Sequence, residues 1–226
     1  MSLILSLETS THVCSVALHD TGKLIATREV HIPQSHATRL APMIEEVRRE
    51  AGIELKQLQA VAVAAGPGSY TGLRIGVSTA KALCYTLQVP LVAVGTLDVM
   101  ASQVAPHQPA DVWLCPMIDA RRMEVYCQVT TPTLEIVQPV EAKIIDESSF
   151  ADLLDRRRIV FFGDGALKCK SAITHPHASF IDDIVPLASA LGVLAHTRFL
   201  EQRVEDLVHF EPFYLKDFLI KKPAAQ

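Results

Sequence analysis

The sequence predicts an α/β protein with mixed sheets, organised as two lobes. Short, nearly continuous apolar runs alternate with stretches of helical period through the first part of the chain, as in proteins whose helices cover sheets. A glycine-rich loop at residues 66–76 stands between one such run and a long apolar helix. The pattern changes after Pro106 and Pro109, so we expect one lobe at residues 1–104 and a second, reduced lobe at 105–226.

The first lobe is expected to open with an antiparallel meander, because Asp20-Thr21-Gly22 is a turn sequence between two apolar runs. An amphipathic helix should follow, with Ser35 as its cap and Gly52 just beyond its end. Thr96 should cap a third helix. The expected strands are 3–7, 13–18, 24–30, 60–65 and 91–94, and the expected helices are 36–51, 71–88 and 96–104.

The second lobe should contain a hairpin whose charged turn holds Asp119 and Arg121. Residues 131–139 are broken by prolines, and Gly163-Asp164-Gly165 is expected to be a turn. The helix at 186–201 could pack on either lobe. The remaining expected elements are strands at 112–118, 124–130 and 159–162 and a short helix at 148–156.

The composition argues for an ordinary globular protein. Hydrophobic residues make up 49% of the 226 residues and the formal net charge is −4, with no basic run longer than residues 156–158. This argues against unaided nucleic-acid binding. The five cysteines are scattered without a C-x-x-C pair, so reduced thiols are expected. No signal peptide or membrane-spanning run is visible, and the expected location is the cytoplasm.

The glycine loop suggests an anion site but fits neither common phosphate motif. Its spacing, G-x-G-x-x-x-G, is one residue off the dinucleotide fingerprint, and no Gly-Lys-Ser/Thr follows. Backbone N–H groups at a helix N-terminus still favour an anion. The candidate anion-binding residues are Thr9, Ser10, Gly68 and Ser69. The alternatives are that Ser69 caps the helix and that residues 8–10 form a turn with satisfied side chains.

The helix at 71–88 carries only two charges, Arg74 and Lys81, and is otherwise apolar on most sides. Small residues recur at every fourth position: Gly72, Gly76, Ala80 and Cys84. Two interpretations remain open at this point. The helix lies at the centre of its own α/β domain, or one face packs on the chain's own sheet and another on a partner.

No catalytic residue, metal ligand or cofactor is assigned from the residue pattern. The nine histidines include no H-x-x-x-H pair, and His175 and His177 flank a proline in an expected loop. Ser69 does not stand in a G-x-S-x-G elbow. Asp119, Arg121 and Glu124 could form an interlobe salt-bridge network or contact a substrate.

The motifs of the chain, taken in order, resemble the bacterial TsaB (YeaZ) family of tRNA threonylcarbamoyladenosine biosynthesis proteins. The resemblance is carried by residues 66–76 with 80–83, and by 4–10, 14–18, 118–121, 124–126 and 212–215. Glu8 departs from the family, which generally has Asp there. The resemblance implies an actin-like fold, shared with sugar kinases and heat-shock ATPases, in which the second lobe is reduced.

The resemblance also implies a non-catalytic scaffold subunit. The catalytic paralogue, TsaD, carries an H-x-x-x-H metal pair just after a strand, whereas residues 94–100 of this chain contain no histidine. The implied role is to pair with TsaD and, with the ATPase TsaE, to support threonylcarbamoyl transfer to adenosine 37 of tRNA. A homodimer is expected when the chain is alone, and contact with tRNA only through partners. The alternatives are a metal-dependent glycoprotease-like peptidase and a small-molecule kinase of the same fold.

Pairing in this family implies use of the two long helices of the first lobe. The residues expected at that contact are His36, Arg39, Leu40, Met43, Ile44, Val47, Thr71, Gly72, Arg74, Ile75, Gly76, Thr79, Ala80 and Leu83.

Overall fold

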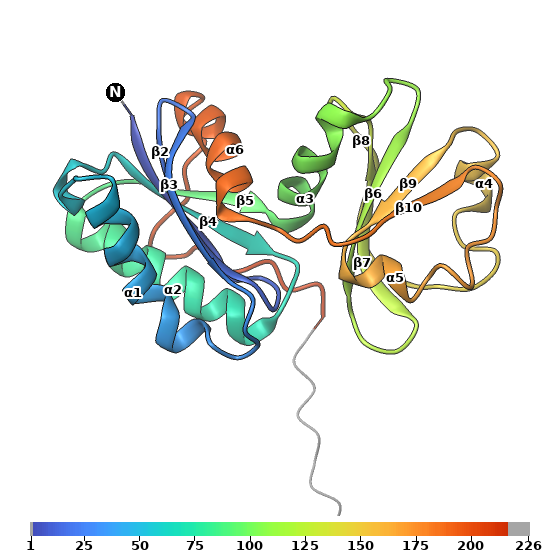
Figure 1. Cartoon of the computed structure of the whole chain (residues 1–226), viewed down its shortest axis with the longest axis horizontal. Coiled ribbons are helices and arrows are strands. Elements are labelled where there is room, and N and C mark those ends of the chain that lie inside the picture. The colour runs from blue at the N-terminus through green and yellow to red at the C-terminus, as the bar shows by residue number, and fades with distance from the viewer. Residues whose placement is uncertain (1, 217–226) are drawn as a thin grey trace, which may run out of the picture.

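The computed structural model describes residues 2–216 and shows two lobes side by side, each built on a five-stranded mixed sheet (Figure 1). The strand order is β3-β2-β1-β4-β5 in the first sheet and β10-β9-β6-β7-β8 in the second. The predicted α/β class with mixed sheets is confirmed.

The first sheet combines an antiparallel meander with two parallel strands. β1 pairs antiparallel with β2 and parallel with β4, and β4 pairs parallel with β5. The central strands are buried along almost their whole length, since helices cover both faces of the sheet, and this explains their continuous apolar runs. The strand bounds are β1 (Leu3–Glu8), β2 (Cys14–Asp20), β3 (Lys23–Val30), β4 (Ala60–Gly66) and β5 (Leu91–Gly95).

Helices α1 (His36–Glu50) and α2 (Tyr70–Leu87) cover one face of this sheet, and α6 (Ala188–Leu200) covers the other (Figure 1). α6 therefore belongs to the first lobe although it comes from the far end of the chain. His19 of β2 donates from Nε2 to Ser189 O at 2.9 Å, and the backbone N–H of Ala188 donates to Ser15 Oγ at 2.9 Å.

The second sheet confirms the predicted hairpin, since β6 (Trp113–Asp119) pairs antiparallel with β7 (Glu124–Thr130). The expectation of a proline-broken segment at 131–139 is wrong in part, because β8 (Ile136–Ile144) runs through Pro139. β8 lies at the edge of the sheet and has a neighbouring strand on one side only. A proline, which has no backbone N–H to donate, is tolerated at such an edge. The rest of the lobe is β9 (Ile159–Phe162), α4 (Ala151–Leu154), α5 (Asp164–Leu167) and the unpredicted β10 (Ala178–Ile181).

Three local predictions about turns and caps need correction. Gly163, with φ +100, is the N-cap of α5, so Gly163-Asp164-Gly165 begins a short helix instead of forming only a turn. Gly95 is the N-cap of α3 (Thr96–Val104), and Thr96 lies buried inside the first turn. Ser35 does precede α1, but its hydroxyl donates to Ile32 O at 2.7 Å instead of capping the helix.

α3 lies between the two lobes and contributes to the core of each. Leu97 and Met100 pack with the second-lobe residue Phe162, whereas Val99 packs with Ile4 of the first sheet. Two short 3₁₀ helices, Leu55–Gln57 and Ala105–His107, lie in the connections before β4 and after α3. The shared core around α3 joins the lobes into one packed body.

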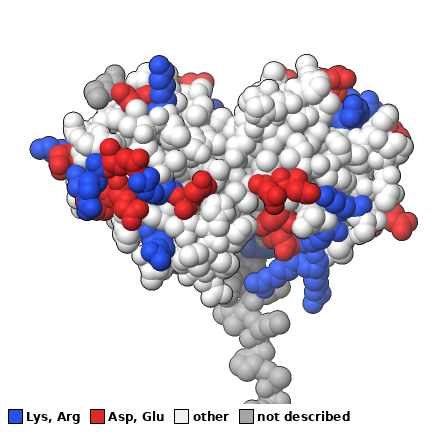
Figure 2. Space-filling model, viewed as in Figure 1, with Lys and Arg blue, Asp and Glu red and all other residues white. Residues whose placement is uncertain are grey.

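The segment after α6 returns across the first lobe. Glu205 N donates to Leu91 O at 2.9 Å, and Phe213 N donates to Ala65 O at 2.7 Å. The surface in Figure 2 is hollowed between the lobes at the top, and acidic and basic side chains lie next to one another over both lobes. All five cysteines are buried free thiols. No helix in the described part of the chain is both long and apolar enough to cross a bilayer.

Candidate functional site

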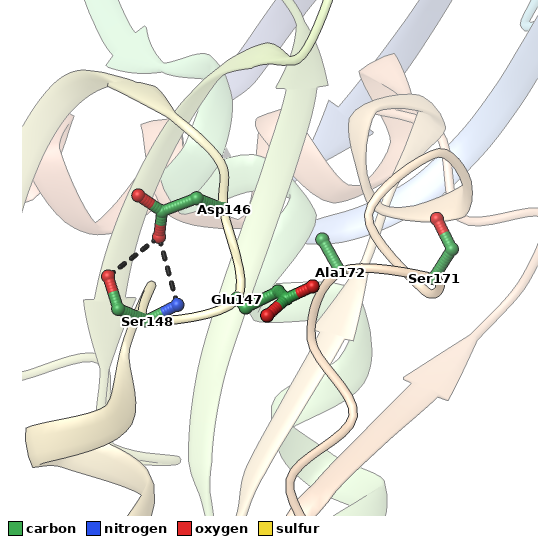
Figure 3. A pocket seen from close by; sticks show the side chains of 5 residues that line it. All are labelled: Asp146, Glu147, Ser148, Ser171 and Ala172. Carbon is green, nitrogen blue, oxygen red and sulfur yellow. Dashed lines mark hydrogen bonds between the residues drawn. The ribbon is translucent and has the colours of Figure 1, made fainter.

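A pocket of about 560 Å³ lies at the rim of the second lobe, between the loop after β8 and the loop after α5 (Figure 3). Two of its lining residues, Asp146 and Ser148, are hydrogen-bonded to each other. Asp146 Oδ1 accepts hydrogen bonds from Ser148 N at 3.0 Å and from Ser148 Oγ at 2.8 Å, and these bonds lower the pKa of Asp146. This pocket is an open surface depression whose polar groups stabilise its own loop.

The glycine loop is packed against the end of β1. Ser69 N donates to Ser10 O at 2.6 Å, and Thr9 Oγ1 donates to Gly72 O at 2.8 Å. A methyl group added at Gly68 would overlap Ser10 O, and one added at Gly72 would overlap Thr9 O. The glycines therefore allow the start of α2 to approach the backbone of residues 9–10 closely.

These contacts do not support the predicted anion cradle. Thr9 and Ser10 are fully buried, and Ser69 Oγ accepts from Gly72 N at 3.2 Å as the cap of α2. The structure does bring the four candidate residues Thr9, Ser10, Gly68 and Ser69 together, but Thr9 Oγ1, Ser10 O, Ser69 N and Ser69 Oγ are all hydrogen-bonded within the chain. The alternative interpretation, in which Ser69 caps the helix and residues 8–10 form a turn with hydrogen-bonded side chains, describes most of the loop.

The Glu8 carboxyl group and the Ser10 hydroxyl are the exceptions to this satisfied arrangement. The carboxyl is fully buried, and Oε1 accepts a hydrogen bond from Ser10 N at 2.6 Å. Within residues 2–216, Glu8 Oε2 and Ser10 Oγ have no hydrogen-bond partner. Burial raises the pKa of Glu8 from 4.5 to about 7, so the group changes charge near neutral pH.

Asp119 and Glu124 belong to a network that holds the β6–β7 turn. Lys168 Nζ binds Asp119 Oδ1 and donates to Glu124 O at 2.7 Å, while Asp164 Oδ1 accepts from Asp119 N at 3.0 Å. Burial raises the pKa of Asp164. Arg121 lies exposed at the tip with φ 72 and takes part through its backbone N–H, which donates to Asp119 Oδ1 at 2.9 Å. Glu124 Oε2 also forms an ion pair with Lys216 of the C-terminal segment. The salt-bridge interpretation therefore describes Asp119, whose pair with Lys168 lies within the second lobe, and Glu124, whose pair reaches the C-terminal segment.

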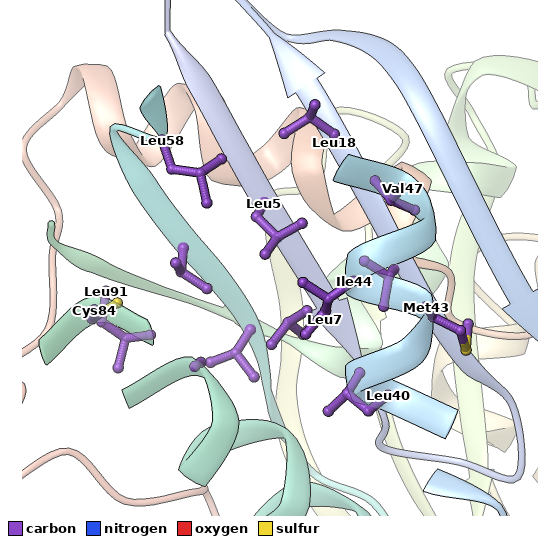
Figure 4. Close-up of a cluster of buried hydrophobic side chains, with 14 of the residues drawn as sticks. Leu5, Leu7, Leu18, Leu40, Met43, Ile44, Val47, Leu58, Cys84 and Leu91 are labelled. Carbon is purple, nitrogen blue, oxygen red and sulfur yellow. The ribbon is translucent and has the colours of Figure 1, made fainter. Parts of the chain in front are cut away.

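Most residues expected at the partner contact lie inside the chain's own first lobe. Figure 4 shows Leu40, Met43, Ile44 and Val47 of α1 pointing into the core between the helix and the sheet. His36 is buried as well, and its Nε2 donates to Val13 O at 3.3 Å. For these five residues the expectation is corrected, because a partner cannot reach side chains that the sheet covers.

The small-residue stripe of α2 is also turned inward. Gly72, Gly76, Ala80 and Cys84 are all buried, and a methyl group at Gly76 would overlap Thr9 Oγ1. The stripe lets α2 approach the chain's own first sheet, so the interpretation of α2 as a central helix holds for this face.

The outer faces of the two helices remain accessible. Arg39, Thr71 and Arg74 are exposed, and Ile75, Thr79 and Leu83 are half-buried. Sequence reasoning missed the most exposed aromatic side chain of α2, Tyr85, which is 72% exposed. Its spacing of four residues from Lys81 could have shown that it lies on the charged face of the helix.

The C-terminal segment beside α2 was also missed as part of this surface. Lys81 Nζ donates to Val208 O and Phe210 O, both at 3.1 Å, and the rings of Tyr70 and Tyr214 lie 4.9 Å apart. The only sequence signal was Lys81 itself, a charged residue in a nearly uncharged helix. Within residues 2–216 no group of three or more His, Cys, Asp or Glu side chains is placed to hold a metal ion.

Comparison with known proteins gives a consistent result along nearly the whole chain. The family model described as TsaD, tRNA N6-adenosine threonylcarbamoyltransferase, matches residues 30–222. The chain is 29% identical to the tRNA threonylcarbamoyladenosine biosynthesis protein TsaB of Haemophilus influenzae, over 95% of this chain and 93% of that protein.

Solved structures support the same relationship. YeaZ from Pseudomonas aeruginosa superposes with a TM-score of 0.84 and 29% identity, covering 95% of this chain and all of that one (100%). The activator of the 2-hydroxyisocaproyl-CoA dehydratase from Clostridium difficile superposes with a TM-score of 0.51 at 10% identity, covering 89% of this chain and 96% of that one. The second likeness shows a shared fold only. Together the neighbours confirm the expected actin-like fold.

Proposed function

This chain belongs to the family of the tRNA N6-adenosine threonylcarbamoyltransferase TsaD and matches the TsaB protein of Haemophilus influenzae over 95% of its length; from this we propose that it is the non-catalytic subunit that pairs with TsaD in tRNA threonylcarbamoyladenosine biosynthesis. With TsaD and the ATPase TsaE, it would support transfer of the threonylcarbamoyl group to adenosine 37 of tRNA, in the cytoplasm.

One observation carries the non-catalytic assignment. Residues 94–100, where the resemblance places the H-x-x-x-H pair of the catalytic paralogue, contain no histidine. Asp98 stands in this stretch instead, and it accepts a hydrogen bond from Gln128 Nε2 at 2.9 Å and lies 3.3 Å from Arg198 NH2. These contacts support a structural use of the segment, since they join α3 to β7 and to α6.

The exposed faces of α1 and α2 are the surface we propose for pairing with TsaD. Arg39, Thr71, Arg74 and Tyr85 lie on this surface. A second copy of this chain would use the same surface when TsaD is absent, because paralogous interfaces are close to self-complementary. We propose that tRNA is contacted through the partners, and the mixing of acidic and basic side chains in Figure 2 supports this.

The test is reconstitution of the modification from purified components. TsaD, TsaE, threonylcarbamoyl adenylate and unmodified tRNA are combined with and without this chain, and modified adenosine is quantified by mass spectrometry. The proposal expects strong dependence on this chain together with no activity of the chain alone. Modification that is unchanged when the chain is omitted, or activity of the chain alone, would contradict it.

A further inference from the structure

The exposed side of α2 carries a second pocket, of about 350 Å³, between the helix and the C-terminal segment. The polar residues that α2 contributes to its lining are Tyr70, Arg74, Ser78 and Lys81, and the opposite side is formed by Phe210, Glu211, Pro212 and Tyr214. The α2 residues are spaced by three or four positions, so they lie along one face of the helix. Tyr85, four residues beyond Lys81, continues the same face toward the end of α2.

Arg74 is held in a fixed orientation in this pocket. Its NH1 donates to the Tyr70 hydroxyl at 2.7 Å, and its guanidinium carbon lies 5.3 Å from the centre of the Tyr70 ring. A guanidinium has five N–H donors in a planar fork, and one hydrogen bond leaves most of them available. No carboxylate in the described part of the chain forms an ion pair with Arg74.

The C-terminal segment completes the pocket. Lys81 holds it through the carbonyls of Val208 and Phe210, and Tyr214 lies against Tyr70. Burial raises the pKa of the Tyr214 hydroxyl, so this side chain is neutral at physiological pH. The charged groups that line the pocket are Arg74, Lys81 and the exposed Glu211, so its formal charge is positive by one.

We propose that this pocket receives the carboxylate of an Asp or Glu side chain from the protein that pairs with this chain, an inference that rests on the proposed function. The guanidinium fork matches a carboxylate in a bidentate arrangement. The two tyrosine rings would exclude water around the pair, which is typical of the residues that dominate binding at protein interfaces. The pocket is continuous with the exposed face of α2 that the proposed pairing uses.

The experiment measures the dissociation constant of the complex with TsaD by calorimetry for the wild type and for Arg74→Gln, Arg74→Glu and Arg74→Lys. We expect affinity to fall at least tenfold for Arg74→Gln, further for Arg74→Glu, and by an intermediate amount for Arg74→Lys, which keeps the charge but loses the fork. Thermal melting of the isolated variants should stay within a few degrees of the wild type, because Arg74 is exposed.

Lys23→Glu is the matched control, since it makes the same change of charge at the exposed first residue of β3, next to Gly22, which lies close to α6 and away from α2. It should leave affinity unchanged. Wild-type affinity in Arg74→Glu would overturn the proposal while the proposed function stands. If Arg74→Glu abolished the homodimer and left the affinity for TsaD unchanged, the proposal would be overturned as well. The occupant of the pocket would then be a second copy of this chain. A wild-type chain that does not bind TsaD would refute the proposed function itself.

Discussion

Glu8 is an ionisable residue in the interior of the first lobe. It ends β1 with a fully buried carboxyl group that accepts one short hydrogen bond from Ser10 N. The pKa of about 7 in the folded chain lies above the ordinary value of 4.5. The folded protein therefore binds this proton more tightly than the unfolded chain does, and the group stabilises the fold only while it is protonated.

We expect the free energy of unfolding to fall as pH rises from about 4.5 to about 7, by about 3 kcal/mol from this group. Glu8→Gln keeps the shape and removes the titration, so the variant should lack this component. Urea unfolding at pH 5 and pH 8 measures it, with the exposed Glu135→Gln as the control. Equal pH dependence of wild type and Glu8→Gln would contradict the burial argument.

Gly76 tests which way the small-residue stripe of α2 faces. A side chain there would overlap Thr9 Oγ1, and Thr9 is itself fully buried and bonded to Gly72 O. Gly76→Leu should therefore destabilise the isolated chain by about 1–3 kcal/mol or more, measured by urea unfolding. Ser78→Leu, on the exposed face, should cost far less. If the Gly76→Leu variant kept the stability of the wild type and lost only its pairing with TsaD, the small-residue stripe of α2 would face the partner instead of the chain's own sheet.

Among the helices and strands, α2 is an element whose bounds could be predicted from the sequence but whose orientation could not. The helix begins and ends within one residue of its predicted bounds, because Ser69 caps it and its apolar pattern is continuous. Which face meets the chain's own sheet was not predictable, since small residues allow close approach to a sheet and to a partner helix alike. The structure decides this through Thr9, which fills the space beside Gly76.

Other elements escaped prediction for different physical reasons. β8 carries Pro139 and three half-exposed polar residues, and none of its residues is fully buried, so it lacks the apolar alternation of a strand with one buried face. The packing of the C-terminal segment on α2 depends on contacts with Lys81 more than a hundred positions away in sequence, at separations of 127 and 129 residues. The motifs of the first lobe were recognisable because local spacing specifies them.

The exposed face of α2 makes a prediction about pairing. Tyr85 is 72% exposed in the isolated chain, and a buried aromatic side chain contributes strongly to interfaces. Tyr85→Ser should weaken the complex with TsaD about tenfold or more without lowering the stability of the chain. Val193→Ser is the control on α6, at 51% exposure on the opposite side of the sheet. Equal effects of the two substitutions on the dissociation constant would place the interface elsewhere.

At the scale of the whole molecule, the contacts of α3 with both lobes determine whether the lobes unfold together. α3 packs on both cores, and Asp98 connects Gln128 of the second sheet with Arg198 of α6. Gln128 is only 2% exposed, so it depends on this carboxylate for its hydrogen bond. The two lobes should therefore unfold together.

Asp98→Ala leaves Gln128 and Arg198 without their shared partner and should lower the free energy of unfolding by about 1–3 kcal/mol. In the wild type, the fluorescence of Trp113 in the second lobe and the far-ultraviolet circular dichroism of the whole chain should give the same midpoint. Asp182→Ala removes an exposed ion pair with Lys170 and should cost less than about 1 kcal/mol. Equal losses in the two variants would show that Asp98 does not join the lobes.

The most direct measurement of the central claim is size-exclusion chromatography with light scattering on this chain, alone and mixed with TsaD from the same organism. The account predicts a one-to-one heterodimer that forms at the expense of the homodimer. A chain whose mass and elution stay unchanged in the presence of TsaD would contradict the assignment of this protein as its pairing subunit.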